Sequence, residues 1–295
     1  MAYIGIQQQI RSNNRKTVVL LLLFPLLLIV LAVFITRSVQ LAFFLLVACA
    51  VWFVMAYFMN SQLIQKATAS RPLSRKENTR VYNLLENLCI SQGIPMPKLN
   101  VIDDDSLNAF ASGINQETFT ITLSKGIIEK LNDEELEGVI AHELSHIINR
   151  DVRLLIVSII FVGIFAFISE MIFRNLRFFG NDDDDDGKSN FFMMILAVVV
   201  GILAYVIAQL LHFAISRKRE YLADAGAAEM TKRPYALASA LRKVSDDPYI
   251  EAVERRDVAQ LFMHNPKLIK KDFFGSLFAT HPPIEKRIEI LEQYA

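Results

Sequence analysis

The stretch His142-Glu143-Leu144-Ser145-His146 has the form H-E-x-x-H. Histidines four residues apart on an α-helix project from one face, about 40° from each other, so both rings can bind a single metal ion. Glu143 lies to one side of these ligands and is expected to act as the general base that takes a proton from an attacking water. These residue types at this spacing predict zinc-dependent hydrolysis of peptide bonds.

The motif must lie on a helix for this chemistry to work. Asn132 is a good N-cap, Glu135 follows three residues later as in a capping box, and apolar residues then recur at helical spacing as far as Arg150. A chance match to the motif is expected in roughly one in a hundred chains of this length. The helical context favours a metal site over such a match.

A catalytic zinc ion normally has three protein ligands and one open position. We expect Glu220 to be the third ligand, because Glu220 and Asp224 share one face of a predicted helix. Asp224 is then expected to accept the free ring N–H of a ligand histidine and so fix its tautomer. The alternative is a solvated acidic stripe that pairs with neighbouring basic residues, since such charge spacing is common on helices.

Four apolar runs are long enough to cross a bilayer: Thr17–Thr36, Val39–Met59, Leu154–Phe173 and Phe191–Ile215. The last two lie between His146 and Glu220, and two crossings return the chain to the side it left. The two motifs therefore share a compartment. The predicted division of the chain is 1–59 (two spans), 60–153 (first part of the protease domain), 154–215 (a hairpin of two spans) and 216–295 (second part).

Positive charge predicts the orientation of these spans. Lysine and arginine residues cluster before the first span, after the second, before the third and after the fourth, whereas the opposite side carries few, next to the acidic run Asp182–Asp186. By the positive-inside rule, both termini and the metal site are cytoplasmic. The acidic run is expected to be a solvated loop in preference to a cation site. The first apolar run is too long for a signal peptide, which is the alternative.

Composition agrees with an enzyme in a lipid bilayer, since 53% of residues are hydrophobic and the formal net charge is +0. The chain has no basic domain, so no nucleic-acid partner is expected. Outside the spans we predict helices and a small edge β-sheet, listed here: helices Ser74–Gln92, Arg217–Met230, Pro234–Val244 and Pro283–Gln293, strands Lys98–Asp103 and Phe119–Leu123, and a hairpin arm Asn108–Gly113.

The hairpin arm suggests a way of holding substrate. If it is a sheet edge, an extended peptide can add to it as a further strand, with Asn108 and Phe110 at the binding surface. The alternative is an ordinary edge strand with Phe110 in the core, and both readings are compatible because alternate residues of a strand face opposite ways.

Four segments together resemble the HtpX-type membrane zinc metalloproteases, relatives of the prenyl-protein endopeptidases: H-E-L-S-H, E-Y-L-A-D, N-A-F-A-S-G and T-H-P-P. The match runs from about Ser70 to the C-terminus. It implies a gluzincin-like domain with one zinc ion per subunit, for which the residues are as follows: ligands His142, His146 and Glu220, base Glu143, orienting carboxylate Asp224, and further active-site residues Asn108, His281 and Arg287.

The last two residues can also be judged physically. His281 precedes two prolines that lead into a helix, and Arg287 follows just over one turn later, so both side chains can point to one site. They are expected to donate hydrogen bonds to the oxyanion that forms when water attacks the scissile carbonyl. The alternatives are a capping or surface role for His281 and a salt bridge to Glu285 or Glu289 for Arg287.

The sequence thus predicts a mainly α-helical integral membrane protein of the bacterial inner membrane, with four transmembrane helices and a cytosolic zinc endopeptidase domain. The resemblance implies polypeptide substrates, namely membrane or misfolded proteins, and a role in quality control and stress response. One alternative is a prenyl-protein endopeptidase, although such enzymes carry more spans. The other is a non-hydrolytic zinc scaffold, which would need a closed four-ligand shell and no base.

Overall fold

The computed structural model describes residues 11–22, 39–157, 160, 199, 217–246 and 282–294. The chain divides into two compact units. The first comprises Met1–Asn14, Met59–Ile156 and Ile215–Ala295, and the second comprises Arg15–Phe58 and Val157–Ala214. Every described candidate site residue belongs to the first unit. His281 and the acidic run Asp182–Asp186 lie outside the described residues.

Helix α2, Val39–Phe58, matches the second predicted span to within one residue. Among the described residues, no single helix is both long and apolar enough to cross a membrane, whereas Leu46–Met55 and Asn60–Thr68 taken together meet the requirement by length and composition alone. The other three predicted spans lie mostly outside the described residues, so the number of spans stays a prediction.

The motif helix is α6, Asp133–Ile148, and it begins as predicted. The Asn132 side chain accepts a hydrogen bond from the backbone N–H of Glu135, and the Glu135 carboxylate accepts one from the backbone N–H of Asn132. This capping box satisfies two donors that a helix N-terminus otherwise leaves free. The following turns are buried almost completely, so α6 forms the centre of the core.

Glu135 also ties α6 to helix α10, Pro234–Asp246. Its carboxylate accepts hydrogen bonds from the Ser239 hydroxyl and from Lys243 Nζ, both at 2.7 Å. Burial alone would raise the pKa of Glu135, but the hydrogen bonds from Lys243, Ser239 and the Asn132 backbone outweigh it and hold the pKa below its ordinary value. The carboxylate is therefore charged in the folded chain and links two helices.

The sheet has four strands in the order β1-β2-β4-β3, with these bounds: β1 Arg71–Pro72, β2 Lys98–Ile102, β3 Ala109–Ser112 and β4 Thr120–Ser124. β2 and β4 are parallel, and β3 pairs antiparallel with β4. The predicted hairpin is therefore confirmed. Gly113 at its turn has φ 105°, and a Cβ there would lie 2.3 Å from the Thr118 carbonyl oxygen. Glycine is the residue that this turn requires.

Helix α4, Thr79–Gln92, starts five residues later than predicted. Residues 75–77 form a turn, and the Asn78 side chain caps the helix by accepting from the backbone N–H of Val81. Gly93 ends the helix with φ 63°, as its position after the last apolar residue predicted. Three short elements were not predicted, because periodicity is weak over few residues: β1, α3 Asn60–Thr68 and α5 Lys125–Lys130.

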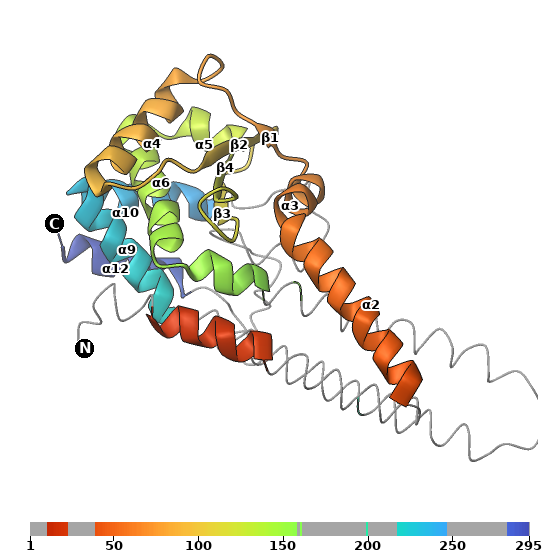
Figure 1. Cartoon of the computed structure of the whole chain (residues 1–295). Helices are drawn as coiled ribbons and strands as arrows, with labels where there is room; N and C mark the ends of the chain where they lie inside the picture. The colour runs from red at the N-terminus through yellow and green to blue at the C-terminus, as the bar shows by residue number, and fades with distance from the viewer. Residues whose placement is uncertain are drawn as a thin grey trace, which may run out of the picture. The chain divides into compact units, whose positions relative to one another are not determined.

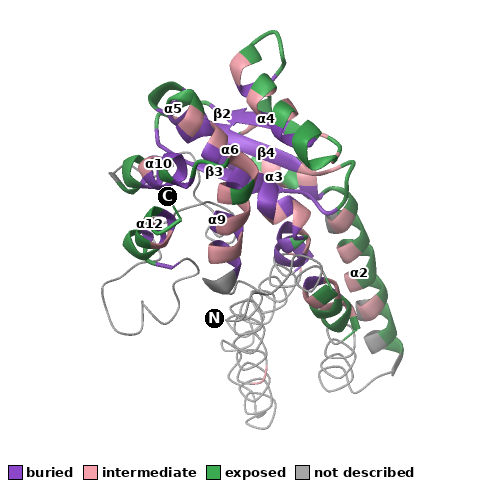
Figure 2. Ribbon diagram, turned by 90° about the vertical axis from the view of Figure 1, so that its left-hand side faces the viewer, coloured by how far each residue is buried: buried purple, intermediate pink, exposed green. Residues whose placement is uncertain are grey.

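Helices α9, Arg217–Thr231, and α12, Ile284–Glu292, also belong to this unit. α6 packs against β3 and β4 as well as against α4, α9 and α10, and α12 packs on α9 and α10 (Figure 1). Two glycines permit this close packing, since a Cβ on Gly138 would lie 3.2 Å from the Leu237 backbone and one on Gly226 would lie 2.4 Å from Ser145 Oγ. Burial is concentrated on α6 and the central strands (Figure 2).

Candidate metal centre

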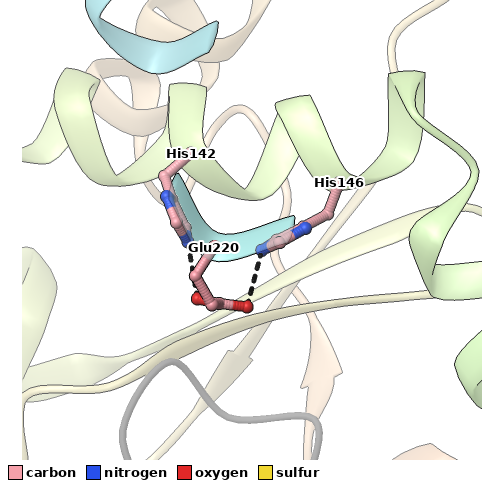
Figure 3. A group of neighbouring side chains, drawn as sticks. All are labelled: His142, His146 and Glu220. Carbon is pink, nitrogen blue, oxygen red and sulfur yellow. Dashed lines mark ion pairs between the residues drawn. The ribbon is translucent and has the colours of Figure 1, made fainter. Parts of the chain in front are cut away.

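Three side chains from two helices converge on one point. His142 and His146 extend from the same face of α6, and Glu220 of α9 lies opposite, with its carboxylate between the two rings (Figure 3). Nε2 of His142 is 3.6 Å from Glu220 Oε2, and Nε2 of His146 is 3.6 Å from Oε1. The structure therefore brings together the three residues that the sequence predicted as metal ligands.

This donor set fits a divalent zinc ion. One ligand atom from each residue can be chosen so that all lie within 4.8 Å of one another. A tetrahedral ion with bonds of about 2.1 Å separates its ligand atoms by about 3.4 Å, which is close to the two 3.6 Å separations. Two imidazole nitrogens and one carboxylate oxygen are also a ligand set of catalytic zinc sites, where the fourth position is open.

The ring nitrogen of His142 that faces away from this point contacts Asp224. Asp224 Oδ1 is 3.0 Å from His142 Nδ1. Arg287 of α12 donates to both oxygens of the same carboxylate, from Nε at 2.8 Å and from Nη2 at 2.7 Å. All three side chains are buried. The arginine therefore pairs with Asp224, and not with Glu285 or Glu289 of its own helix.

Asp151, which was not among the predicted site residues, makes the corresponding contact with the second histidine. Its Oδ2 lies 3.1 Å from His146 Nδ1. Each histidine thus has one ring nitrogen directed at Glu220 and the other at an aspartate. A carboxylate in this place orients a metal-binding imidazole and fixes its tautomer. The signal was present as an aspartate five residues after the motif, just beyond the predicted helix end.

The charges of the site shift its pKa values. Burial alone would lower the pKa of His142, but hydrogen bonds to Asp224 and Glu220 outweigh it and raise the pKa to about 9. Burial raises the pKa of Glu143, although the two histidines oppose this. Burial would also raise the pKa of Asp224, yet the charge of Arg287 holds it below its usual value. A metal ion must therefore displace a proton from His142.

Asn108 and Phe110, the predicted substrate-binding residues, are both buried. The backbone of Asn108 is fixed at the start of β3, because its N–H donates to Ser124 Oγ and its carbonyl accepts from the Ser124 N–H, both at 3.0 Å. Its side-chain oxygen accepts from the Ala109 N–H at 2.9 Å. Within the described residues, β3 forms one edge of the sheet.

Comparison with known proteins agrees with this geometry. The profile of Peptidase family M48 matches residues 75–295. A Protease HtpX homolog from Bacteroides fragilis (strain YCH46) is 56% identical over all of both chains. One from Dictyoglomus thermophilum is 38% identical over 96% of this chain and 93% of its own. The crystal structure of S. mikatae Ste24p, 18% identical, covers 97% of this chain and 67% of that chain with a TM-score of 0.55, which shows a shared fold. The predicted metalloprotease is confirmed, and the chain belongs to peptidase family M48.

Proposed function

We propose that this chain is a zinc-dependent endopeptidase of a bacterial inner membrane that cleaves polypeptides at the cytoplasmic face. One observation carries the proposal. In a chain of a peptidase family, two imidazole nitrogens and a buried carboxylate converge within bonding range of a single ion, and Glu143 follows the first ligand directly. A structural zinc site has no need of such a base, so the glutamate argues for hydrolysis over a scaffold.

His142, His146 and Glu220 would hold one zinc ion, which supplies the Lewis acidity that polarises the scissile carbonyl and acidifies water. Asp224 and Asp151 would keep the two rings in the tautomer that has a lone pair on Nε2. The His142 side chain is buried, and that of His146 is 12% exposed.

Glu143 would move the protons of the reaction. Its carboxylate accepts a proton from the attacking water and then passes it to the leaving amine nitrogen. Burial raises its pKa, which makes the carboxylate a stronger proton acceptor than an exposed glutamate. The same residue can thus serve as base first and as acid afterwards.

The oxyanion would be stabilised from α12 and the segment before it, by Arg287 and by His281. Arg287 uses Nε and Nη2 on Asp224, while Nη1 makes no hydrogen bond within the described residues and forms an ion pair with Glu220 Oε2 at 3.6 Å. This nitrogen is therefore the donor that remains for substrate. His281 retains the role that the family resemblance implies.

Substrate would bind as an extended strand along β3. Backbone hydrogen bonds at a sheet edge recognise many sequences, which suits an enzyme with varied substrates. Asn108, fixed at the start of this strand, would bind substrate polar groups. Phe110 is 1% exposed, so we assign it the role of holding the strand against the core.

The membrane arrangement follows the sequence argument: four spans, with the protease domain in the two parts 60–153 and 216–295, and both termini cytoplasmic. Exposed apolar side chains along α2, such as Phe44 and Val51, support a lipid-facing helix there. Membrane or misfolded proteins are the proposed substrates, in quality control and stress response. A prenyl-protein endopeptidase is the second candidate, and the Ste24p likeness is compatible with it but shows the fold alone.

The test is metal-dependent proteolysis by the purified full-length chain in detergent. Chelation should abolish casein cleavage, and one equivalent of zinc per chain should restore it. A prenylated C-terminal peptide, assayed in parallel with its unprenylated form, separates the two candidates, because the proposed enzyme should show no preference for the prenyl group. Absence of casein cleavage at full zinc loading would contradict the proposal.

A further inference from the structure

A buried polar cluster lies on the side of His146 that faces away from Glu220. It contains Asn13, Asn149, Asp151 and Arg219. The Asn13 side-chain amide donates to Asp151 Oδ1 at 2.6 Å and to the Asn149 carbonyl oxygen at 2.9 Å. Arg219 Nε lies 3.9 Å from Asp151 Oδ1. A residue from the N-terminal helical segment 11–22 therefore contacts the carboxylate that contacts a candidate metal ligand.

The backbone after α6 is shaped to aim Asp151 at His146. Asn149 ends the helix in the right-handed region, and Arg150 then adopts φ 58°, which is uncommon for a residue other than glycine. Asp151 follows at the start of the helical residues 151–157, where a helix N-terminus favours a negative charge. A residue other than glycine held at positive φ, against its backbone preference, is typical of functional sites.

We propose that Asn13 and Asp151 are positioning residues that hold His146 in the orientation and tautomer needed to bind the metal, so that the N-terminal segment is part of the metal site. The inference rests on the proposed function. It assigns no direct contact with substrate or metal to either residue.

The hydrogen bonds explain why these residue types are needed. Each Asp151 oxygen has its own partner, since Oδ2 accepts from His146 Nδ1 and Oδ1 accepts from Asn13. The carboxylate is thereby fixed in its plane, and a pure acceptor keeps the ring proton on Nδ1. An amide at position 151 can instead donate to Nδ1, which would move the ring proton to Nε2 and remove the lone pair that the metal requires.

Zinc affinity tests this directly, with the full-length chain in detergent and a chelator of known affinity as competitor. The variants are Asp151→Asn, Asn13→Ala and the two combined. Asn14→Ala is the matched control, because Asn14 is the adjacent residue of the same type and, among the described residues, makes no hydrogen bond to the cluster. The melting temperature of the metal-free protein and the visible spectrum of the Co²⁺-loaded protein are recorded for each variant.

Asp151→Asn should weaken zinc binding about 10- to 100-fold, as is usual for a carboxylate that orients a metal-binding histidine. Asn13→Ala should weaken zinc binding less, by up to about 10-fold, because Asn13 contacts Asp151 and not His146 itself. The combined variant should bind zinc as Asp151→Asn does, because Asn13 acts through Asp151 and the two losses do not add. The Co²⁺ spectrum should change in the three cluster variants and stay constant in Asn14→Ala.

Unchanged zinc affinity and Co²⁺ spectrum in Asn13→Ala and Asp151→Asn would overturn the inference, even if the metal-free protein melts at a lower temperature, since that result describes a structural role only. If the losses of zinc affinity in the two single variants add up in the combined variant, Asn13 does not act through Asp151. If the Asp151→Asn protein does not accumulate in cells, the Asn13→Asp variant takes its place in the test. A carboxylate beside Asp151 should weaken zinc binding more than Asn13→Ala does, and an equal or smaller loss would overturn the inference. Failure of the unaltered chain to bind zinc would contradict the proposed function instead.

Discussion

Replacement of Arg287 by methionine tests the electrostatic centre of the site. The guanidinium is 0% exposed and donates to both oxygens of Asp224, so its removal leaves a buried carboxylate with one partner fewer. Methionine keeps much of the side-chain length and removes only the charge and the donors. We expect a loss of stability as well as a loss of turnover.

The size of the stability loss follows from the geometry. Removing one partner of a buried ion pair costs about 3–5 kcal/mol. The lower end applies here, because His142 remains 3.0 Å from Asp224 and shares its charge. For a folded unit of this size, about 3 kcal/mol corresponds to a melting temperature roughly 6–12 °C lower.

The assay is thermal unfolding of the full-length chain in detergent, with Arg242→Met as control. Arg242 of α10 pairs with Glu292 of α12 at the surface, where both side chains are about half exposed. Such a pair contributes about 1 kcal/mol or less, so the control should melt within about 4 °C of the unaltered chain. An Arg287→Met variant that melts no lower than the control would refute the buried ion pair.

Three further predictions concern ligand identity, acid stability and topology. Glu220→Gln should lower zinc occupancy at limiting metal, because an amide oxygen is a weaker ligand than a carboxylate; full occupancy would exclude Glu220 as a ligand. The lowered pKa of Glu135 means that its stabilisation is present above the unfolded pKa and is lost as the pH falls through the folded pKa. Glu135→Gln should therefore lower the melting temperature at pH 7, by the equivalent of about 1–3 kcal/mol, and the difference should shrink in acid; a constant difference would contradict the link to Lys243. In intact cells a cysteine at Asp184 should react with an impermeant label, and one at the exposed Glu129 should react only after lysis; the reverse pattern would refute the cytoplasmic assignment.

Local sequence signals predicted much of the fold correctly. The capping box at Asn132, the hairpin at Gly113 and the helix end at Gly93 each depend on a few neighbouring residues with strong conformational preferences. The start of α4 was placed too early, since Ser74 and Asn78 are both good caps and only the three-dimensional turn selects the second. β1 has two residues and no periodicity, so pairing with β2 alone defines it.

The residues of the candidate site likewise differ in how far local sequence signals predict them. The spacing of His142 and His146 on one helix made these ligands predictable, and the shared face of Glu220 and Asp224 made the second helix a candidate. Asp151 and Asn13 were missed because their roles depend on contacts across the fold: Asp151 follows a left-handed residue that no pattern announces, and Asn13 is 138 residues away from it in sequence. Likewise, the partner of Arg287 lies on another helix, whereas sequence reasoning offered only glutamates on its own.

The central claim, that Glu143 and a bound metal together hydrolyse peptide bonds, is tested most directly by the Glu143→Gln variant. No metal ligand changes, so zinc content measured on the purified protein should equal that of the unaltered chain. Casein cleavage should fall to background, since the amide cannot accept the proton of the attacking water. Near-normal cleavage by this variant at full zinc content would contradict the account.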